Sequence, residues 1–306
     1  MQPSEAAETP VRSLSVAIEA IVALTFWASV PVVVRFIQAN PFTIGLFRLT
    51  VATVLLRILF VRREALRNLK RRDWFGLAAI GLIFGVHWVL YFFSIKVGSA
   101  SIGAIGLAGY GAFLIVLSAI VDRVRLTFVD LAAVGLCVVG SLFLIPNFDA
   151  NSHVVQGLLL GAGSAFCFAC LPILHRRFRH IGSGVRATGQ FGFALPVFLL
   201  GAPLADFRGL PISDWWWLAY LAIFCTVIGH GLWVRVTTVL EPMTTSTVYY
   251  LYLPLSLSFS YLFLGEALDV KILFGAAFIA LGSILGIRNQ SRKIRRAQAR
   301  SDDAGK

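Results

Sequence analysis

The sequence predicts an all-α integral membrane protein with ten transmembrane helices, arranged as two inverted repeats of five helices each. Hydrophobic residues make up 58% of the 306 residues and charged residues only 14%, whereas a soluble domain carries nearer a quarter charged residues. The apolar residues gather in runs of about 20 residues, which is the length of a membrane-crossing helix. Finally, features of the first half recur in the second half at one fixed spacing.

This internal repeat consists of matched residues 144 positions apart, as in 229 − 85 = 144. The matched pairs include Gly45 with Gly189, Phe47 with Phe191, Arg35 with Arg179, Gly85 with Gly229, and Asp122 with Glu266. Because each half holds an odd number of spans, the second half must enter the membrane from the opposite side. Many secondary transporters are built from such inverted repeats, and their substrate sites lie where the repeats meet near the bilayer midplane.

The first five spans follow one another with short breaks. The first run lacks a small-residue cleavage site and is long enough to cross, so it is a first helix and not a signal peptide. Asn40-Pro41 separates it from the second run, and clusters of Arg and Lys end the second and fourth runs. Because backbone groups in hydrocarbon must bond within their own segment, the runs are helices. The predicted spans are 15–37, 42–61, 74–95, 100–121 and 127–145.

The second five spans begin after Pro146-Asn147 and are divided by further Gly and Pro residues. The breaks contain Gly182-Ser183-Gly184, Gly209-Leu210-Pro211 and Glu241-Pro242. The predicted spans are 154–174, 184–204, 215–236, 244–264 and 270–288. The chain therefore divides into a cytoplasmic N-terminal segment (1–14), a first repeat (15–145), a second repeat (146–288) and a basic cytoplasmic tail (289–306).

The positions of Lys and Arg predict the orientation in the membrane. The second, fourth and sixth breaks and the tail hold clusters of them, whereas the odd-numbered breaks hold one at most. The eighth break is nearly uncharged and does not discriminate. Since positive charge favours the cytoplasmic side, both termini are expected in the cytoplasm, with the chain in a bacterial-type inner membrane.

The net charge of +12 is thus explained by topology and contact with the lipid bilayer, and no nucleic acid partner is expected. The tail is expected to be partly disordered on anionic lipid.

The stretch 249–286 resembles a known family. It reads Tyr-Tyr-Leu-Tyr-Leu-Pro254, then Leu264-Gly265-Glu266, then Gly275 and Gly282. These features are similar to the drug/metabolite transporter superfamily, specifically its two-repeat EamA-type transporters. The resemblance implies a carrier that exports amino acids or other small metabolites. The first half departs from the pattern, because Tyr110 stands at the position equivalent to Pro254 and no Gly precedes Asp122.

Ionisable residues at membrane depth are functional candidates by default, because burying them is costly. Arg48 lies within the second span. It either anchors a substrate carboxylate, or it extends to the outer interface or pairs with carbonyls. His87 and His230 lie deep in the third and eighth spans. They are candidates for substrate binding or proton coupling, with helix-to-helix hydrogen bonding as the alternative. Glu19 is a third proton-coupling candidate, with an interfacial position as its alternative.

Aromatic residues complete the predicted binding site. Trp88, Tyr110, Tyr249 and Tyr250 lie on spans expected to line a central route, and such walls suit a small amphipathic or aromatic substrate. The alternative is an aromatic belt at the lipid interface. Gly109 and Pro254 are the predicted bending points. The route is expected between the first, third, fourth, sixth, eighth and ninth spans.

The sequence therefore predicts a secondary transporter, a permease for efflux of small organic metabolites by alternating access. An importer or exchanger and a lipid flippase remain alternatives. A membrane-embedded enzyme is the remotest, because the acids lie mostly at helix ends and the histidines stand alone. No cofactor or metal is expected, since the sequence has no P-loop or dinucleotide motif and the four cysteines lie in apolar runs without further ligands nearby. The sequence does not define substrate, coupling ion or oligomeric state.

Overall fold

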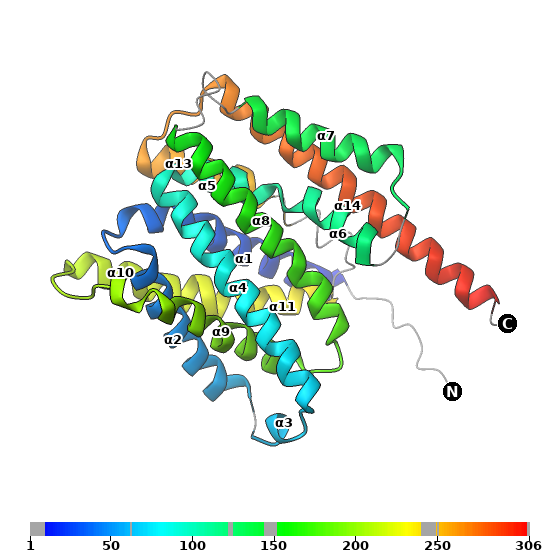
Figure 1. Cartoon of the computed structure of the whole chain (residues 1–306), viewed down its shortest axis with the longest axis horizontal. Coiled ribbons are helices and arrows are strands. Elements are labelled where there is room, and N and C mark those ends of the chain that lie inside the picture. Colours follow the sequence, from blue (N-terminus) through cyan, green and yellow to red (C-terminus); the bar gives the residue numbers. More distant parts are fainter. Residues whose placement is uncertain are drawn as a thin grey trace.

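The protein is a bundle of helices in a computed structural model that describes residues 10–61, 63–121, 125–143, 152–239, 249 and 251–304 (Figure 1). Within these residues there is no β-strand. The α-helices of the first half are α1 (Pro10–Phe36), α2 (Pro41–Phe60), α3 (Arg63–Arg67), α4 (Arg71–Val97), α5 (Ala100–Ala108), α6 (Tyr110–Val121) and α7 (Phe128–Phe143). Those of the second half are α8 (His153–Arg177), α9 (Ser183–Leu200), α10 (Ile212–Tyr220), α11 (Gly229–Val239), α13 (Tyr252–Leu264) and α14 (Val270–Ala304). A short 3₁₀ helix, η1 (Ala202–Leu204), follows α9, and a π-helical segment, η2 (Leu221–Ile228), joins α10 to α11.

Six helical segments in the described residues are long and apolar enough to cross a membrane. They are Ile18–Phe36, Pro41–Leu59, Arg71–Val97, Ala100–Val121, His153–Arg177 and Ile212–Trp233. Shorter apolar helices occupy Phe128–Ser141, Tyr252–Leu264 and Val270–Gly286. The predicted helical fold is therefore confirmed for the described residues, and its long apolar helices are consistent with a membrane protein. The count of ten spans and their inverted arrangement remain predictions, and residues 240–248, which include the start of the ninth predicted span, lie outside the described residues.

Polar side chains fix where several helices begin. Asn40 precedes α2, and its side-chain oxygen accepts a hydrogen bond from the backbone N–H of Thr43 at 3.0 Å. Ser99 caps α5 in the same way through the N–H of Ile102, at 3.2 Å. Such caps satisfy backbone donors that have no partner within the helix. Each of these helices therefore starts at a residue defined by its own local sequence.

Glu266 provides a second cap for α5 from the far end of α13. Its two carboxylate oxygens accept hydrogen bonds from the backbone N–H groups of Ala100 and Ser101, each at 2.9 Å. A carboxylate at a helix N-terminus is favoured by the helix dipole and by charge-assisted hydrogen bonds. Glu266, the acid of the second repeat's Gly-Glu corner, thus ties the loop after α13 to the start of α5.

We expect Glu266→Gln to lower the stability of the protein by about 1–2 kcal/mol, because the amide accepts with one oxygen and turns an NH₂ group toward a backbone donor. Thermal unfolding of the purified protein in detergent measures this. Glu64→Gln, on the exposed α3, is the matched control and should leave the midpoint unchanged. Equal midpoints for the two variants would contradict a capping role for Glu266.

The interior of the bundle is organised around α4, which packs against α8 on one side and α9 on the other (Figure 1). The α5 helix also packs on α8, and their backbones approach closely where glycines face each other: a Cβ atom added to Gly106 would lie 2.8 Å from the Cα atom of Gly161. Ser94 on α4 adds a hydrogen bond to the carbonyl of Gly157 at 2.7 Å. Small residues at helix contacts are the usual way in which membrane helices pack tightly.

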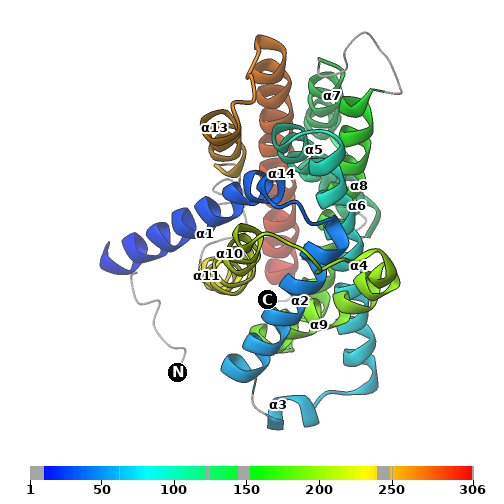
Figure 2. The same ribbon diagram turned by 90° about the vertical axis from the view of Figure 1, so that its left-hand side faces the viewer.

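Two peripheral features frame this interior. Figure 2 shows α1 running across the other helices, with its N-terminal end projecting from the bundle. The α7 helix pairs with α14 along the upper right edge of the bundle in Figure 1.

The tail differs from its prediction, because α14 continues as one helix to Ala304. Asn289 and Lys293 of α14 bond to the buried Asp130 of α7, which holds the start of the tail against the bundle.

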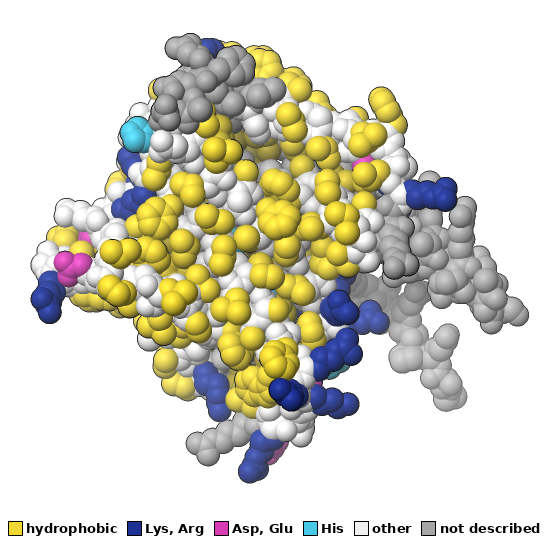
Figure 3. Space-filling view, viewed as in Figure 1, with side chains coloured by type: hydrophobic (Ala, Val, Ile, Leu, Met, Phe, Trp, Pro, Cys, Tyr) yellow, Lys and Arg dark blue, Asp and Glu magenta, His cyan; other side chains and the backbone are white. Residues whose placement is uncertain are grey.

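The surface in Figure 3 has an apolar middle and basic edges. Hydrophobic side chains cover the centre of this face, and Lys and Arg side chains gather at its lower end, around α3 and the start of α4. A face of this kind suits a helix bundle surrounded by lipid, with the charged edge at the level of the head groups.

Candidate functional site

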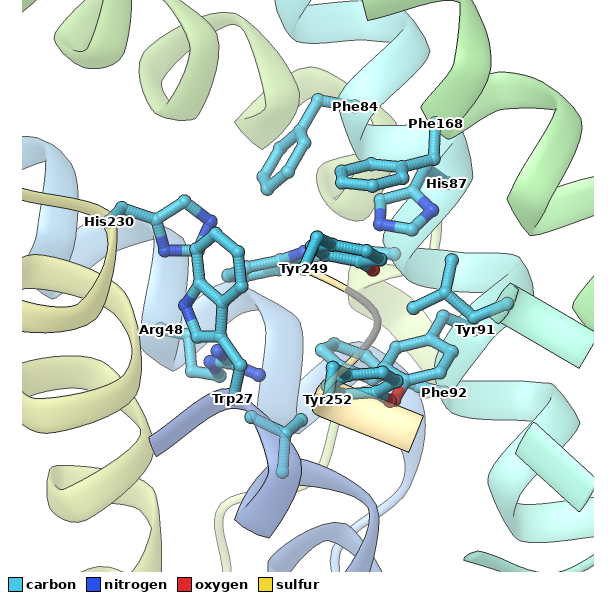
Figure 4. Close-up of a pocket in the computed structure, with 13 residues that line it drawn as sticks. Trp27, Arg48, Phe84, His87, Tyr91, Phe92, Phe168, His230, Tyr249 and Tyr252 are labelled. Carbon is cyan, nitrogen blue, oxygen red and sulfur yellow. The ribbon is translucent and has the colours of Figure 1, made fainter. Parts of the chain in front are cut away.

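A pocket of about 60 Å³ lies among the helices of the bundle. It is lined by Trp27, Val30, Arg48, Phe84, His87, Trp88, Tyr91, Phe92, Leu107, Phe168, His230, Tyr249 and Tyr252 (Figure 4). These residues come from α1, α2, α4, α5, α8, α11, α13 and the segment just before α13. Both halves of the chain therefore contribute to one site.

Arg48 is the only charged residue among the described residues that line the pocket. It is 2% exposed, and its guanidinium lies over the ring of Trp88, with the central carbon 4.1 Å from the ring centroid. Its Nε and Nη2 donate to the hydroxyl of Thr226 at 3.1 and 2.9 Å. Its Nη1 is buried without a hydrogen-bond acceptor. The Nε and Nη2 atoms of the guanidinium are thus held by Thr226, whereas Nη1 is a donor that no protein acceptor satisfies.

The π-helical segment η2 positions the partner of Arg48. The hydroxyl of Thr226 donates to the carbonyl of Leu221, five residues earlier, at 2.7 Å. Because this donation uses the only hydroxyl proton, the oxygen of Thr226 faces Arg48 as an acceptor. π-helical turns inside α-helices are rare and often occur at functional sites. Thr226 is therefore a positioning residue for Arg48.

We expect Thr226→Val to weaken substrate binding by about tenfold, because it removes the acceptor that fixes the guanidinium while keeping the shape of the side chain. The maximal transport rate should change less than the KM, since Arg48 itself remains. Thr226→Ser keeps the hydroxyl and should restore the KM. Transport kinetics in proteoliposomes measure both values, and an unchanged KM in Thr226→Val would contradict the positioning role.

His87 lies on α4 and is fixed by Ser164 of α8. Its Nδ1 lies 3.1 Å from the carbonyl oxygen of Ser164 and 2.7 Å from its hydroxyl. The hydroxyl of Ser164 is also placed to donate to the carbonyl of His87, at 3.1 Å. Since a carbonyl only accepts, these contacts favour a proton on Nδ1 and an acceptor lone pair on Nε2.

His230 follows the same pattern on α11. Its Nδ1 lies 3.3 Å from the carbonyl of Cys225, so the proton is again favoured on Nδ1. The same carbonyl accepts from the indole N–H of Trp27 at 3.0 Å. In Figure 4, Tyr249 lies between His230 and His87. In the tautomer that these contacts favour, the Nε2 atoms of both imidazole rings are acceptors.

Stacked and edge-on aromatic rings make up most of the remaining wall. The ring of Trp27 is 4.7 Å from that of His230, centroid to centroid, and His87 stacks on Phe168 at 5.0 Å. The hydroxyls of Tyr91 and Tyr252 are hydrogen-bonded to each other. Aromatic walls with a few polar groups are typical of sites for small organic molecules.

The structure gathers Arg48, His87, Trp88, His230 and Tyr249 around this one pocket. Other predicted residues are placed elsewhere. Tyr110 is buried one layer behind the wall, edge-on to Tyr249 at 5.0 Å between ring centroids, and it is not a lining residue. Tyr250 lies outside the described residues. Glu19 lies on α1 away from the pocket lining.

The two predicted bending points have different surroundings. Gly109 separates α5 from α6, so the fourth predicted span is interrupted there. Pro254 lies in the first turn of α13, where the missing N–H of a proline interrupts no helical hydrogen bond.

Phe84, Phe168 and Thr226 also belong to the site but could not be selected as candidates from the sequence. Phenylalanine is frequent in this chain, with 25 residues, so a single one gives no signal. The bond between Thr226 and Arg48 joins residues 178 positions apart, and only the fold brings them together.

Comparison with known proteins identifies the family of this chain. The EamA-like transporter family matches twice, over residues 14–145 and 155–288. A protein of Salmonella typhimurium named "Probable amino-acid metabolite efflux pump" is 25% identical over 66% of this chain and 72% of its own. An "Uncharacterized transporter" of Clostridium kluyveri is 20% identical over 83% of this chain and 85% of its own.

One solved structure, described as "Crystal structure of protein", has the same fold. It superposes with a TM-score of 0.61 over 92% of this chain and 99% of its own, at 18% identity. The two family matches together cover most of the chain, one in each half. The chain therefore belongs to the EamA-like transporter family of the drug/metabolite transporter superfamily, whose members are membrane transporters and not enzymes.

Proposed function

We propose that this chain is a secondary transporter that exports small organic carboxylates, amino acids or related metabolites, by alternating access. The observation that carries the proposal is Arg48, which lines the pocket and whose buried Nη1 has no acceptor. A buried guanidinium is well suited to bind a carboxylate, and an unused donor costs free energy unless a ligand satisfies it. The name of the Salmonella relative, an amino-acid metabolite efflux pump, supports export as the direction.

The proposed membrane is the bacterial inner membrane, with both termini in the cytoplasm. The basic clusters in the second, fourth and sixth breaks and in the tail support this orientation. Gly109, between α5 and α6, and Pro254, at the start of α13, are the proposed bending points. Movement at these two residues would open the small pocket first to one side of the membrane and then to the other.

A proton gradient is the proposed driving force, with His87, His230 and Glu19 as candidate proton carriers. The two histidines line the pocket together with Arg48, so protonation of either one would change the charge that a bound substrate meets. Glu19 is on α1, the helix that also contributes Trp27 to the wall. A protonatable carboxylate on a helix that lines the route is a common feature of proton-driven carriers.

Counterflow in proteoliposomes tests the proposal. Vesicles containing the purified protein are loaded with unlabelled amino acids, other organic acids, nucleosides or sugars, and uptake of the labelled compound is followed. Exchange of a carboxylate class, lost in Arg48→Ala, would support the proposal. The matched control is Arg57→Ala, which removes an arginine from the end of α2, where it bonds to the carbonyl of Val61 and does not line the pocket. Exchange restricted to uncharged compounds would contradict it.

The same vesicles separate substrate exchange from proton coupling. A variant that loses only the coupling site should still exchange substrate, since exchange needs no net proton movement, but it should no longer accumulate substrate when a pH gradient is imposed. We expect this result for at least one of Glu19→Gln, His87→Gln and His230→Gln. Gradient-driven accumulation that persists in all three would exclude these residues as proton carriers.

A further inference from the structure

We infer that the pocket selects organic monoanions, carboxylates with an apolar body and no free amine, over zwitterionic amino acids. This inference rests on the proposed function, because it takes Arg48 as the anchor of a transported carboxylate. It narrows that proposal, since amino acids and simple carboxylic acids share the carboxylate and differ in the ammonium group. The observation behind it is the balance of charge in the pocket.

The described lining holds one positive charge and no negative charge. Arg48 is buried, and every other described lining residue is neutral or apolar when the two histidines are uncharged. The nearest described acid along a lining helix is Glu19, eight residues before Trp27 on α1, which corresponds to about 12 Å along the helix axis. Isolated buried charges are costly, and they are stabilised by an opposite charge at close range. A monoanion supplies that charge and leaves the occupied pocket neutral.

An ammonium group would find no carboxylate among the described residues that line the pocket; the remaining aromatic rings and the histidine nitrogens there carry no net charge. The ring faces of Trp88 and Phe92 already lie beneath the guanidinium of Arg48, at 4.1 and 5.5 Å, so the cation–π positions there are taken. The Nε2 atoms of His87 and His230 accept hydrogen bonds but carry no charge. A zwitterion would therefore leave one positive charge in the pocket uncompensated. Its ammonium group would also lie near the guanidinium, and the two positive charges would repel each other.

The same acceptors suggest which neutral groups the preferred ligand carries. Each histidine is favoured with its proton on Nδ1, directed to the carbonyl of Ser164 or Cys225, so its Nε2 remains for a donor from the ligand. A hydroxyl or an amide N–H next to the carboxylate matches such an acceptor without adding charge. The inferred class is thus hydroxy acids, N-acylated amino acids and simple acids with an aliphatic or aromatic body.

Matched ligands that differ only at the amine test this inference. The full chain in detergent is titrated with 4-methylpentanoate, leucine and leucinamide, and with 3-phenylpropanoate, phenylalanine and phenylalaninamide. Binding is followed through the fluorescence of the pocket tryptophans, with confirmation by thermal shift. We expect each acid to bind at least about tenfold more tightly than its amino acid, and the amides to show no binding. The acid preference should persist, with weaker affinity, in Arg48→Lys and disappear in Arg48→Met, while Arg57→Ala behaves as the unchanged protein.

The other outcomes separate the two proposals. If an amino acid binds as tightly as its acid or more tightly, and counterflow of amino acids depends on Arg48, the inference is overturned and the proposed function stands. If the acids bind equally well to a folded Arg48→Met variant, verified by size-exclusion chromatography, the anchor and the inference both fail. If no carboxylate binds and none is exchanged in vesicles, the proposed function fails with the inference.

Discussion

Replacing Arg48 with methionine is expected to abolish substrate exchange while leaving the folded protein at least as stable as before. The transport loss follows because the anchoring donor is gone. The folded protein should keep its stability because the substitution removes a buried cation that has no acid among the described residues lining the pocket. Exchanging a buried ion for an apolar side chain of similar volume is often neutral or stabilising, by up to about 4 kcal/mol.

The groups around Arg48 make methionine the appropriate substitution. The hydroxyl of Thr226 keeps its hydrogen bond to the carbonyl of Leu221 after the change, so the change leaves no buried donor without a partner. Methionine also fills irregular space and packs well against aromatic rings, which here means Trp88. The lost contact between the guanidinium and Trp88 is worth up to about 2 kcal/mol and limits the gain.

Thermal unfolding in detergent without substrate, together with counterflow, measures both effects. Arg48→Ala provides the comparison, because it removes the charge but leaves a cavity, and its unfolding midpoint should fall below that of Arg48→Met. A lower midpoint for Arg48→Met than for the unchanged protein would show that the arginine stabilises the bundle. Arg48 would then be a structural residue, contrary to its assignment as the substrate anchor.

The candidate pocket shows which kinds of residue the sequence could point to. Arg48, His87 and His230 stand out because polar groups at membrane depth are costly and rare, and the fold brings all three to one pocket. Aromatic residues are harder to rank. Tyr249 lies in the wall and Tyr110 one layer behind it, and this difference depends on helix rotation, which apolar spans with little periodicity do not reveal.

The features that the sequence did not predict depend on backbone geometry. The wide turns of η2 place Thr226 against Arg48, and no local motif marks a π-helical segment. The helical tail of α14 is a second case. Basic residues suggested a loosely held segment, whereas Lys293 and Asn289 both bond to the buried Asp130 of a different helix. In each case the stabilising contact joins segments far apart in the chain, so local sequence carries no signal for it.

Substituting alanine for Gly161 is expected to destabilise the bundle by about 1–3 kcal/mol and to impair the site. A Cβ atom at this position would lie 2.9 Å from the Cα of Gly106 and 3.1 Å from the hydroxyl oxygen of Ser94. The first neighbour is backbone, so it can move only if α5 and α8 separate. Because α8 also carries Ser164, which fixes His87, separation of these helices would disturb one wall of the pocket.

Gly163 provides a matched control on the same helix. A Cβ atom there would meet only the Cδ1 atom of Leu90, at 3.3 Å, and a leucine side chain can adjust. Gly163→Ala should therefore be neutral, or more stable by about 0.5–1 kcal/mol because alanine favours the helix. Unfolding midpoints and counterflow rates of the two variants provide the comparison. If Gly161→Ala matched Gly163→Ala in both measurements, the close approach of α5 and α8 would not determine the geometry around His87.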